Sequence, residues 1–386
     1  MSEKDLKFST KAVHSGNRAD PSTGAIIPPI YATSTYKQDG VGEHKGFDYS
    51  RAVNPTREMH EKNIAALENG KHGIAFSTGM AAVTALFQIF NSRDHFIISR
   101  NTYGGTYRLL DEVFKRHGYD FDFVDTRELS HVKSHIKKNT KMVFIETPTN
   151  PLLEITDIKS LSKICNNHNL ILGVDNTFMS PYGQRPLELG ADIVMHSSTK
   201  FLGGHSDLLG GILVTNDSSL VDQLRFIQKS AGATPSAFDC WLLLRSTKTL
   251  ALRFQRQCDS AFALAKWLEK KNIDRVIYPG LESFPQHGLA KQQQRTPDGQ
   301  TIFGSMISID LGSIKYRDSF LSKLKIFSLA ESLGGVESLI SNPFHMTHGT
   351  ISIDRKLLMD ITEGLIRVSV GIEDEIDLRN DLEQAL

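Results

Sequence analysis

The sequence has few cysteines, no long apolar run and no excess of either charge. Its 386 residues include only three cysteines, Cys165, Cys240 and Cys258, and no two of them have C-x-x-C spacing. This odd, scattered set argues against a disulfide-stapled secreted protein and is typical of buried thiols in a reducing compartment, so we expect a cytoplasmic protein. No apolar run reaches the roughly 18 residues that a membrane helix needs. The amino-terminal residues have mixed charge and no apolar core, unlike a signal peptide.

The charges balance, with 44 Lys and Arg residues against 44 Asp and Glu residues. A net charge of zero gives no overall attraction to nucleic acid or to an anionic membrane, and we expect neither as a partner. Hydrophobic residues make up 40% of the chain and charged residues 23%, as in ordinary globular proteins. At ~150 residues per domain, the length favours about two or three domains.

Short apolar segments alternate with amphipathic ones between about residue 60 and residue 245. The apolar segments predict strands at 73–76, 95–99, 121–124, 142–146, 170–175, 192–196 and 210–215. Helical patterns separate them, as at 105–117 and 158–168. Such alternation favours an α/β fold with a mostly parallel, doubly wound, seven-stranded sheet that is covered on both faces.

The chain on either side of this region has a different pattern. Residues 1–58 are rich in Pro, Gly, Thr and Tyr, which predicts an extended arm that packs on another subunit. From residue 246 to residue 386 we expect a smaller α+β domain, with one long or two adjoining helices over 240–271 at its start. Its expected strands lie near 305–310, 324–327 and 366–370. The predicted domains are therefore an arm at 1–58, a large domain at 59–245 and a carboxyl-terminal domain at 246–386.

Residues suited to chemistry follow the predicted strands, where open α/β sheets place their ligands. A Ser-Thr-Gly-Met turn at 77–80 opens a helix. The free N–H groups of such a helix start bind phosphate well, although an ordinary N-cap would have the same sequence. Asp175 ends a buried strand, where its carboxylate could cap the next segment or hold a protonated ring nitrogen.

The stretch around Lys200 carries the strongest of these signals. Lys200 is expected to be buried, and burial lowers the pKa of an amine, which suits a lysine that bonds to an aldehyde; a snorkelling surface lysine is the alternative. The hydroxyls of Ser197 and Thr199 flank it and could bind phosphate oxygens. The ring of Tyr103 could stack on a flat cofactor or lie in the core. Together these segments suit a single ligand that carries a phosphate, a cationic aromatic ring and an aldehyde. Pyridoxal 5′-phosphate (PLP) has all three groups.

The chain also resembles, over nearly its whole length, the cystathionine γ-synthase, γ-lyase and methionine γ-lyase group of PLP enzymes. The motifs that carry this resemblance are Tyr49-Ser-Arg51, Asn54-Pro-Thr-Arg57, Ser77-Thr-Gly-Met80, Tyr103-Gly-Gly-Thr106, Glu146-Thr-Pro-Thr-Asn-Pro151, Val174-Asp-Asn-Thr-Phe178, the Lys200 segment, Ala330-Glu-Ser-Leu-Gly-Gly335 and Arg367-Val-Ser-Val-Gly-Ile-Glu373. The resemblance implies PLP fold type I with a smaller carboxyl-terminal domain. It also implies a homotetramer built as a dimer of dimers.

The same resemblance implies roles for individual residues. It makes Lys200 the proton carrier and Tyr103 its partner in catalysis. The implied cofactor-binding residues are Tyr49 and Arg51 from the neighbouring subunit, together with Gly79, Met80, Tyr103, Asp175, Ser197, Thr199 and Lys200. The implied substrate-binding residues are Asn150, Glu331, Ser332, Arg108 and Arg367, of which Arg367 grips the carboxylate with a bidentate fork.

Two positions narrow the substrate by resemblance. Methionine γ-lyases carry a cysteine in place of Gly105 and lack an acid in place of Glu331, whose carboxylate can hold the distal ammonium of cystathionine. We therefore expect a cystathionine enzyme of sulfur amino-acid metabolism. The stretch 178–187 favours γ-elimination to cysteine, 2-oxobutyrate and ammonia. A synthase that joins cysteine to an O-acyl-homoserine, and a β-lyase that yields homocysteine and pyruvate, stay open.

Other classes of function find less support in the sequence. A catalytically silent relative would be expected to lose Lys200 or Asp175, and both are present. The glycines at 40–46 follow no predicted strand and lack the spacing of a dinucleotide fingerprint, which argues against a dehydrogenase. His345 and His348 have no third ligand at a recognisable spacing, so we expect no metal site and place both histidines on the surface.

Overall fold

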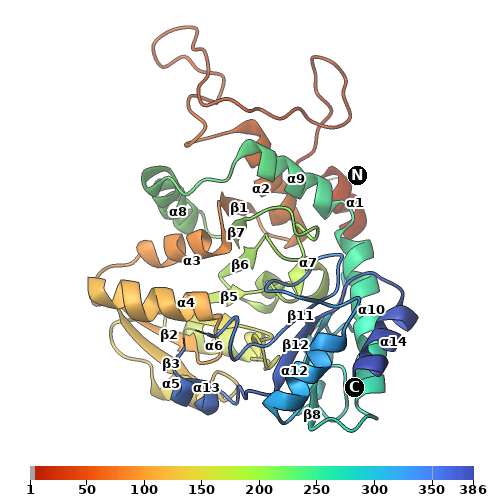
Figure 1. The fold of residues 1–386 in the computed structure, drawn as a ribbon. Helices are drawn as coiled ribbons and strands as arrows, with labels where there is room; N and C mark the ends of the chain where they lie inside the picture. The colour runs from red at the N-terminus through yellow and green to blue at the C-terminus, as the bar shows by residue number, and fades with distance from the viewer. Residues whose placement is uncertain (1–4, 350) are drawn as a thin grey trace.

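The computed structural model describes residues 5–349 and 351–386. Within these residues the strands form two sheets, which lie side by side (Figure 1). The large sheet has the strand order β1-β7-β6-β5-β4-β2-β3. Its strands are His72–Phe76 (β1), His95–Ser99 (β2), Asp120–Val124 (β3), Thr140–Glu146 (β4), Ile171–Asp175 (β5), Ile193–Ser197 (β6) and Gly211–Thr215 (β7). Only β7 runs antiparallel to its neighbours, so the predicted mostly parallel sheet of seven strands is confirmed.

Both faces of the large sheet are covered, as the apolar strands predict. Side chains alternate along a strand, so Met142 and Phe144 of β4 face one layer whereas Val143 and Ile145 face the other. The first layer contains α3 (Gly79–Gln88) and α8 (Ser218–Ala231), and the second contains α5 (Leu129–Ser134) and α6 (Ile158–Asn167). Burial on both faces explains why the central strands, such as β4, are nearly continuous apolar runs.

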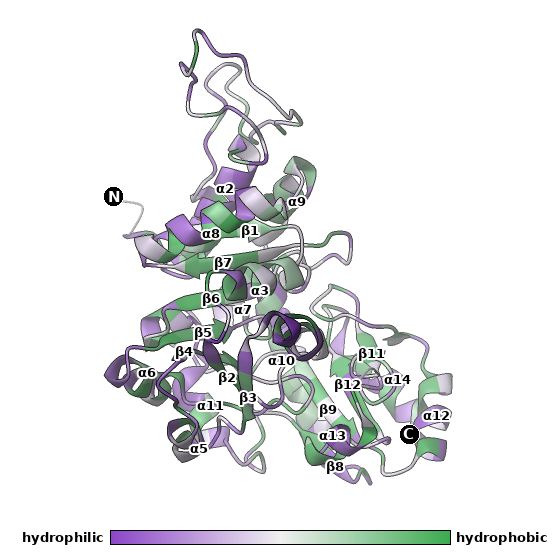
Figure 2. Cartoon of the chain, turned by 90° about the vertical axis from the view of Figure 1, so that its left-hand side faces the viewer, coloured by the Kyte–Doolittle hydropathy of each residue, from purple (hydrophilic) through white to green (hydrophobic). Residues whose placement is uncertain are grey.

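The smaller sheet belongs to the carboxyl-terminal part and has the order β10-β11-β12-β9-β8. Its strands are Arg275–Ile277 (β8), Met306–Asp310 (β9), Ser328–Leu329 (β10), Leu339–Ser341 (β11) and Leu365–Ser369 (β12). The carboxyl-terminal part also contains α11 (His287–Gln293), α12 (Ile314–Lys323), α13 (Ile353–Leu358) and α14 (Glu375–Ala385). Of these, α12 and α14 pack into the core of the smaller sheet. The predicted smaller α+β domain is thus present, coloured mainly hydrophobic along its strands in Figure 2.

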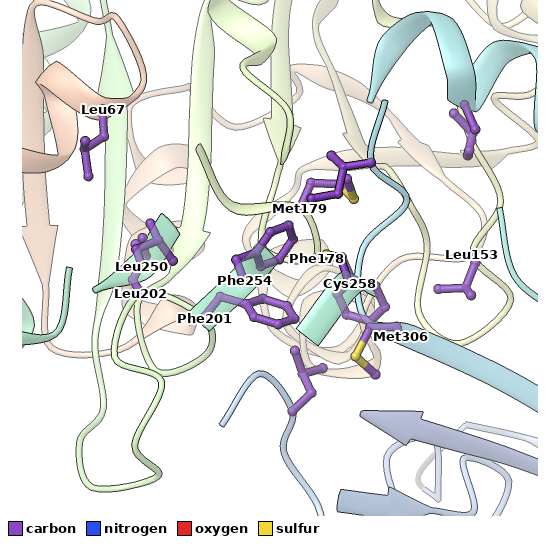
Figure 3. Packing of buried hydrophobic residues seen from close by; sticks show 14 of the residues in the cluster. Leu67, Leu153, Phe178, Met179, Phe201, Leu202, Leu250, Phe254, Cys258 and Met306 are labelled. Atoms are coloured by element: carbon purple, nitrogen blue, oxygen red, sulfur yellow. The ribbon is translucent and has the colours of Figure 1, made fainter. Parts of the chain in front are cut away.

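Two adjoining helices, α9 (Ala237–Thr247) and α10 (Leu250–Leu268), connect the two sheets, as one of the two expected arrangements. The first half of α10 packs into a core that includes Phe201, Phe254 and Met306 (Figure 3). Its second half packs into the core of the smaller sheet. The predicted domain boundary at 245–246 falls in the last turn of α9 and stays a prediction. No helix in the described ranges is long and apolar enough to cross a membrane.

Two local predictions are wrong, and one predicted helix is present but irregular. Residues 324–327 are not a strand, because the carboxylate of Asp381 on α14 accepts the N–H groups of Lys325, Ile326 and Phe327 that a neighbouring strand would otherwise use. The helix expected at 105–117 is α4 (Gly104–Arg108) followed by a π turn at 109–113 and a 3₁₀ turn at 114–117. His348 is fully buried and not on the surface.

The amino-terminal arm is less uniform than predicted. It begins with a helix, α1 (Phe8–His14), whose Phe8 and Ala12 are buried, and its last residues start α2 (Pro55–Leu67). The side chain of Asn54 caps α2 by accepting N–H groups of the first turn. The sequence favours this start, because Asn is a preferred N-cap residue and Pro55 suits the first helical position. Residues 16–53, all of which the structure describes, form loops that project beyond the body of the molecule (Figure 1).

Candidate functional site

The site lies at the carboxyl ends of β2, β4, β5 and β6. Tyr103 follows β2, Asn150 follows β4, Asp175 ends β5 and Lys200 follows β6. Neighbouring parallel strands end at one edge of a sheet, so these four side chains come from the same edge. The structure thus brings together, at one edge of the sheet, four residues that the sequence marked at the strand ends.

The start of α3 provides a cradle for an anion. Thr78 caps this helix by accepting the N–H of Ala81, while the first N–H groups, those of Gly79 and Met80, have no acceptor inside a helix. A Cβ added at Gly79 would lie 3.0 Å from both Cβ and Oγ of Ser197, so the helix start closely approaches that hydroxyl. Oriented amides at a helix start suit a phosphate.

Thr199 and Lys200 continue the same loop after β6. The Thr199 hydroxyl exchanges hydrogen bonds with the backbone of Gly210, so it fixes the loop to the start of β7. The next residue, Phe201, is buried in the core between the two sheets. Its ring packs edge-to-face against that of Phe254, with the two ring centroids 4.9 Å apart. These two anchors hold the backbone of Lys200 from both sides.

Lys200 is partly buried, and its pKa is lowered as the sequence predicted. Its Nζ donates to Oγ of Ser332 at 2.9 Å. Burial is the main cause that lowers the pKa of Lys200 to about 8, and the positive charge of Arg367 lowers it further. The carboxylate of Glu331 acts in the opposite direction. At neutral pH an appreciable fraction of this amine is therefore neutral and able to accept a proton.

Arg367 on β12 brings the smaller sheet to the site. Its side chain is buried, with Nη1 donating to Oδ1 of Asn150 at 3.0 Å and Nη2 donating to the carbonyl of Ser332 at 2.8 Å. Within the described residues its Nε has no partner. Burial lowers the pKa of Arg367 to about 10. Through Ser332 the chain of contacts runs from Asn150 to Arg367 and on to Lys200.

Asp175 is a buried carboxylate at the end of β5. Its Oδ1 accepts both the N–H of Thr177, at 3.0 Å, and the hydroxyl of Thr177, at 2.5 Å. Burial raises the pKa of Asp175, while Thr177 and the imidazole of His196 counteract that rise. The Thr177 hydroxyl also accepts the N–H of Ser197 at 2.9 Å, which ties the end of β5 to the end of β6.

Tyr103 is a rim residue, as predicted, with 41% of its surface exposed. A Cβ added at Gly105 would lie 2.5 Å from Cε1 of Tyr103 and 3.1 Å from the sulfur of Met80. The glycine therefore permits the present position of the ring. Glu331 is exposed at the same opening, close enough for its charge to raise the pKa of both Lys200 and Arg367.

Three predicted residues lie outside this constellation in the single chain. Arg51 donates to the carbonyl of Lys229 at 2.8 Å, and its guanidinium lies 5.5 Å from the ring centre of Tyr49. Both belong to the loops of the arm. Arg108 is exposed at the end of α4.

The sequence did not identify Glu146 and Thr177 as functional residues. Both stand in motifs that carry the resemblance, but neither attracted a role. Glu146 ends β4 in register with Asp175 at the end of β5, so the signal that marked Asp175, an acid at the end of a buried strand, applied equally to Glu146.

The donors and acceptors of this site fit PLP. The close approach at Gly79 leaves room for backbone N–H groups to meet a phosphate. A buried carboxylate, Asp175, suits a cationic ring nitrogen, and the half-exposed ring of Tyr103 suits stacking. The partly buried amine of Lys200, with its lowered pKa, suits an aldehyde.

Comparisons with known proteins agree with this reading. Residues 9–386 match the family described as Cys/Met metabolism PLP-dependent enzyme. Cystathionine γ-lyase of Bacillus subtilis is 49% identical over 99% of this chain and 99% of its own. Cystathionine β-lyase of Coxiella burnetii is 46% identical, covering 99% of this chain and 98% of its own.

Relatives with a synthase name match at a similar level. Cystathionine γ-synthase of Mycobacterium leprae is 46% identical over 98% of this chain and 96% of its own. Among solved structures, cystathionine γ-lyase from Lactobacillus plantarum complexed with L-serine has a TM-score of 0.95 at 43% identity and covers 98% of each chain. Similar identity to all three names means that overall similarity does not separate the three activities.

Proposed function

We propose that this chain, which belongs to the family of Cys/Met metabolism PLP-dependent enzymes, is a lyase that cleaves L-cystathionine by γ-elimination. The products are cysteine, 2-oxobutyrate and ammonia. The observation that carries the proposal is the chain of contacts from Asn150 through Arg367 and Ser332 to Lys200, with the carboxylate of Glu331 at its opening. In this arrangement Arg367 is a cation for the α-carboxylate of the substrate, Lys200 is a base beside it, and Glu331 is an anion farther out.

Arg367 and Glu331 would hold the two ends of the substrate. The guanidinium presents a fork to the α-carboxylate and is already oriented by Asn150 and Ser332. Glu331 offers its carboxylate to the distal ammonium of cystathionine, which a substrate such as methionine lacks. Two opposite charges at fixed positions select a long substrate that carries a charge at each end.

PLP, when bound, draws electrons away from the substrate carbons and so makes their protons removable. Lys200 Nζ takes the proton from the α-carbon and then moves the proton of the β-carbon, both steps being open to an amine whose pKa lies near 8. Asp175 accepts the hydrogen bond of a protonated ring nitrogen. Gly79, Met80, Ser197 and Thr199 hold the phosphate.

Tyr103 moves a proton to or from the substrate amine, and its side chain would stack on the ring of PLP. Its exposed position lets substrate enter beside it. A thiol then leaves from the γ-carbon. The stretch 178–187 supports the γ-lyase over the γ-synthase and the β-lyase, because it is more similar to γ-lyases.

Product analysis with L-cystathionine as the sole substrate tests the proposal. Cysteine and 2-oxobutyrate are expected. Homocysteine and pyruvate would instead establish β-elimination, and absence of turnover by PLP-loaded protein would favour the synthase, with an O-acyl-homoserine plus cysteine as the next substrates.

We further propose that the protein works as a dimer of dimers, in which Tyr49 and Arg51 reach the phosphate of the neighbouring subunit. The projecting arm supports this, because it exposes large apolar side chains such as Ile26 and Val41 that a partner would cover. Light scattering should give the mass of a tetramer. A monomer that is fully active would refute this part of the proposal.

A further inference from the structure

Glu146 contacts two loops of the site through a single buried carboxylate. It is the last residue of β4, and 4% of its surface is exposed. Its Oε2 accepts the backbone N–H of Tyr103 at 2.6 Å, and its Oε1 accepts the backbone N–H of Asn150 at 2.7 Å. Tyr103 follows β2 and Asn150 follows β4, so the carboxylate bridges loops from two different strands.

We propose that Glu146 is a positioning residue that fixes the loop of Tyr103 and the loop of Asn150 relative to each other. The inference deepens the proposed function and rests on it. Each oxygen serves one loop, so a movement of either loop lengthens a charge-assisted hydrogen bond. Asn150 in turn accepts from Arg367, so the position set by Glu146 extends to the group that grips the substrate carboxylate.

The environment of Glu146 argues against an incidental buried acid. Burial and the neighbouring charge of Asp175 both raise the pKa of Glu146, while the two N–H groups and Arg367 oppose that rise. Burying an acid beside another acid costs free energy unless strong partners compensate. The two amides that place Tyr103 and Asn150 oppose this cost directly.

Only a carboxylate can serve both loops. It presents acceptors at both oxygens, whereas the amide of glutamine presents one acceptor and one donor. In Glu146→Gln one of the two N–H groups faces an NH₂ group and loses its bond. The substitution keeps size and shape, so it changes hydrogen bonding and little else.

Asp192 provides a matched control at the other edge of the sheet. It is also a carboxylate, here partly buried, that accepts a backbone N–H, that of Leu172 at 2.7 Å, and burial also raises its pKa. It lies at the amino ends of β5 and β6, away from Tyr103 and Asn150. Because it accepts a single backbone N–H in this way, Asp192→Asn keeps an acceptor for its partner.

The experiment compares Glu146→Gln and Asp192→Asn with the unaltered holoenzyme. For each protein we would measure the affinity of the apoprotein for PLP, the visible absorption band of the bound cofactor, and kcat and KM for cystathionine. In Glu146→Gln we expect kcat/KM to fall about ten- to hundredfold, the range for losing one hydrogen bond to a charged group. We also expect weaker PLP binding and a shifted band, while Asp192→Asn keeps all three values.

A double variant separates positioning from stability. If Glu146 acts through Tyr103, its effect on kcat should shrink in a Tyr103→Phe background, because the two changes then remove the same contribution. The proposal would be overturned if the effects of the two substitutions on kcat simply multiplied in the double variant. It would also be overturned if Glu146→Gln had an unchanged absorption band and, per folded site, the kinetic constants of the unaltered enzyme. A lowered melting temperature alone would also count against it.

Glu146→Asp is a second variant, which keeps the charge but shortens the reach by one methylene. It should reproduce the loss of kcat/KM and the altered band. If neither variant folds while Asp192→Asn does, Glu146 is a folding determinant and the positioning role is rejected. The PLP affinity and the absorption band do not depend on which substrate is cleaved, so the inference can be judged even if product analysis rejects the proposed γ-lyase.

Discussion

Acid should destabilise this protein through a buried imidazole, that of His60 on α2. The side chain is fully buried, and neither ring nitrogen has a hydrogen-bond partner among the described residues. Burial lowers the pKa of His60 from its usual 6.5 to about 4, although the charge of Glu61 acts in the opposite direction. The unfolded chain therefore takes up a proton at His60 at a higher pH than the folded chain does.

The sign and size of the effect follow from these two values. As the pH falls through 6.5 towards about 4, the unfolded chain binds more protons, so the free energy of unfolding decreases. The complete loss from His60 is about 3 kcal/mol, of which about 2 kcal/mol has occurred at pH 5. Well above pH 6.5 both states hold a neutral imidazole, and His60 contributes no pH dependence.

The assay is urea unfolding of the unaltered protein and of His60→Leu at pH 8 and at pH 5. Leucine removes both unpartnered nitrogens at similar volume, and the other titrating groups are the same in both proteins and cancel in the difference. We expect His60→Leu to lose about 2 kcal/mol less than the unaltered protein between the two pH values. His168→Leu, at an exposed position, should lose as much as the unaltered protein. An equal loss in His60→Leu would refute the reasoning.

Further predictions concern the site. Arg367→Lys should raise KM for cystathionine about tenfold or more, because an ammonium cannot replace the fork of the guanidinium; steady-state kinetics test this, and an unchanged KM would contradict the assigned grip. Glu331→Val should lower kcat/KM for cystathionine about tenfold or more by removing the partner of the distal ammonium; unaffected turnover would reject that partner. Gly105→Ala should lower kcat, because its Cβ would lie 2.5 Å from Tyr103 and would displace the ring by about 1 Å to reach ordinary contact; the same kcat in both proteins would show that the ring position is unimportant.

The sequence by itself determined the large sheet and the edge at which the candidate site residues gather. Strands covered on both faces leave nearly continuous apolar runs, as in most of this sheet. The edge strand β3 instead alternates Asp and Phe and is only partly buried, and both patterns are visible without long-range information. Lys200 could be identified for a similar reason, since a lysine directly after a buried strand, beside glycines, is a local pattern. Its lowered pKa followed from that burial.

The tertiary structure alone decided which groups meet. Arg367 donates a hydrogen bond to Asn150, 217 positions earlier, and Lys200 donates one to Ser332, 132 positions later. No local sequence pattern predicts either pair. Residues 324–327 have the composition of a strand, but the distant Asp381 accepts their N–H groups. Hydrogen bonds between remote segments depend on how the two sheets pack, whereas hydrophobic periodicity is a property of each segment by itself.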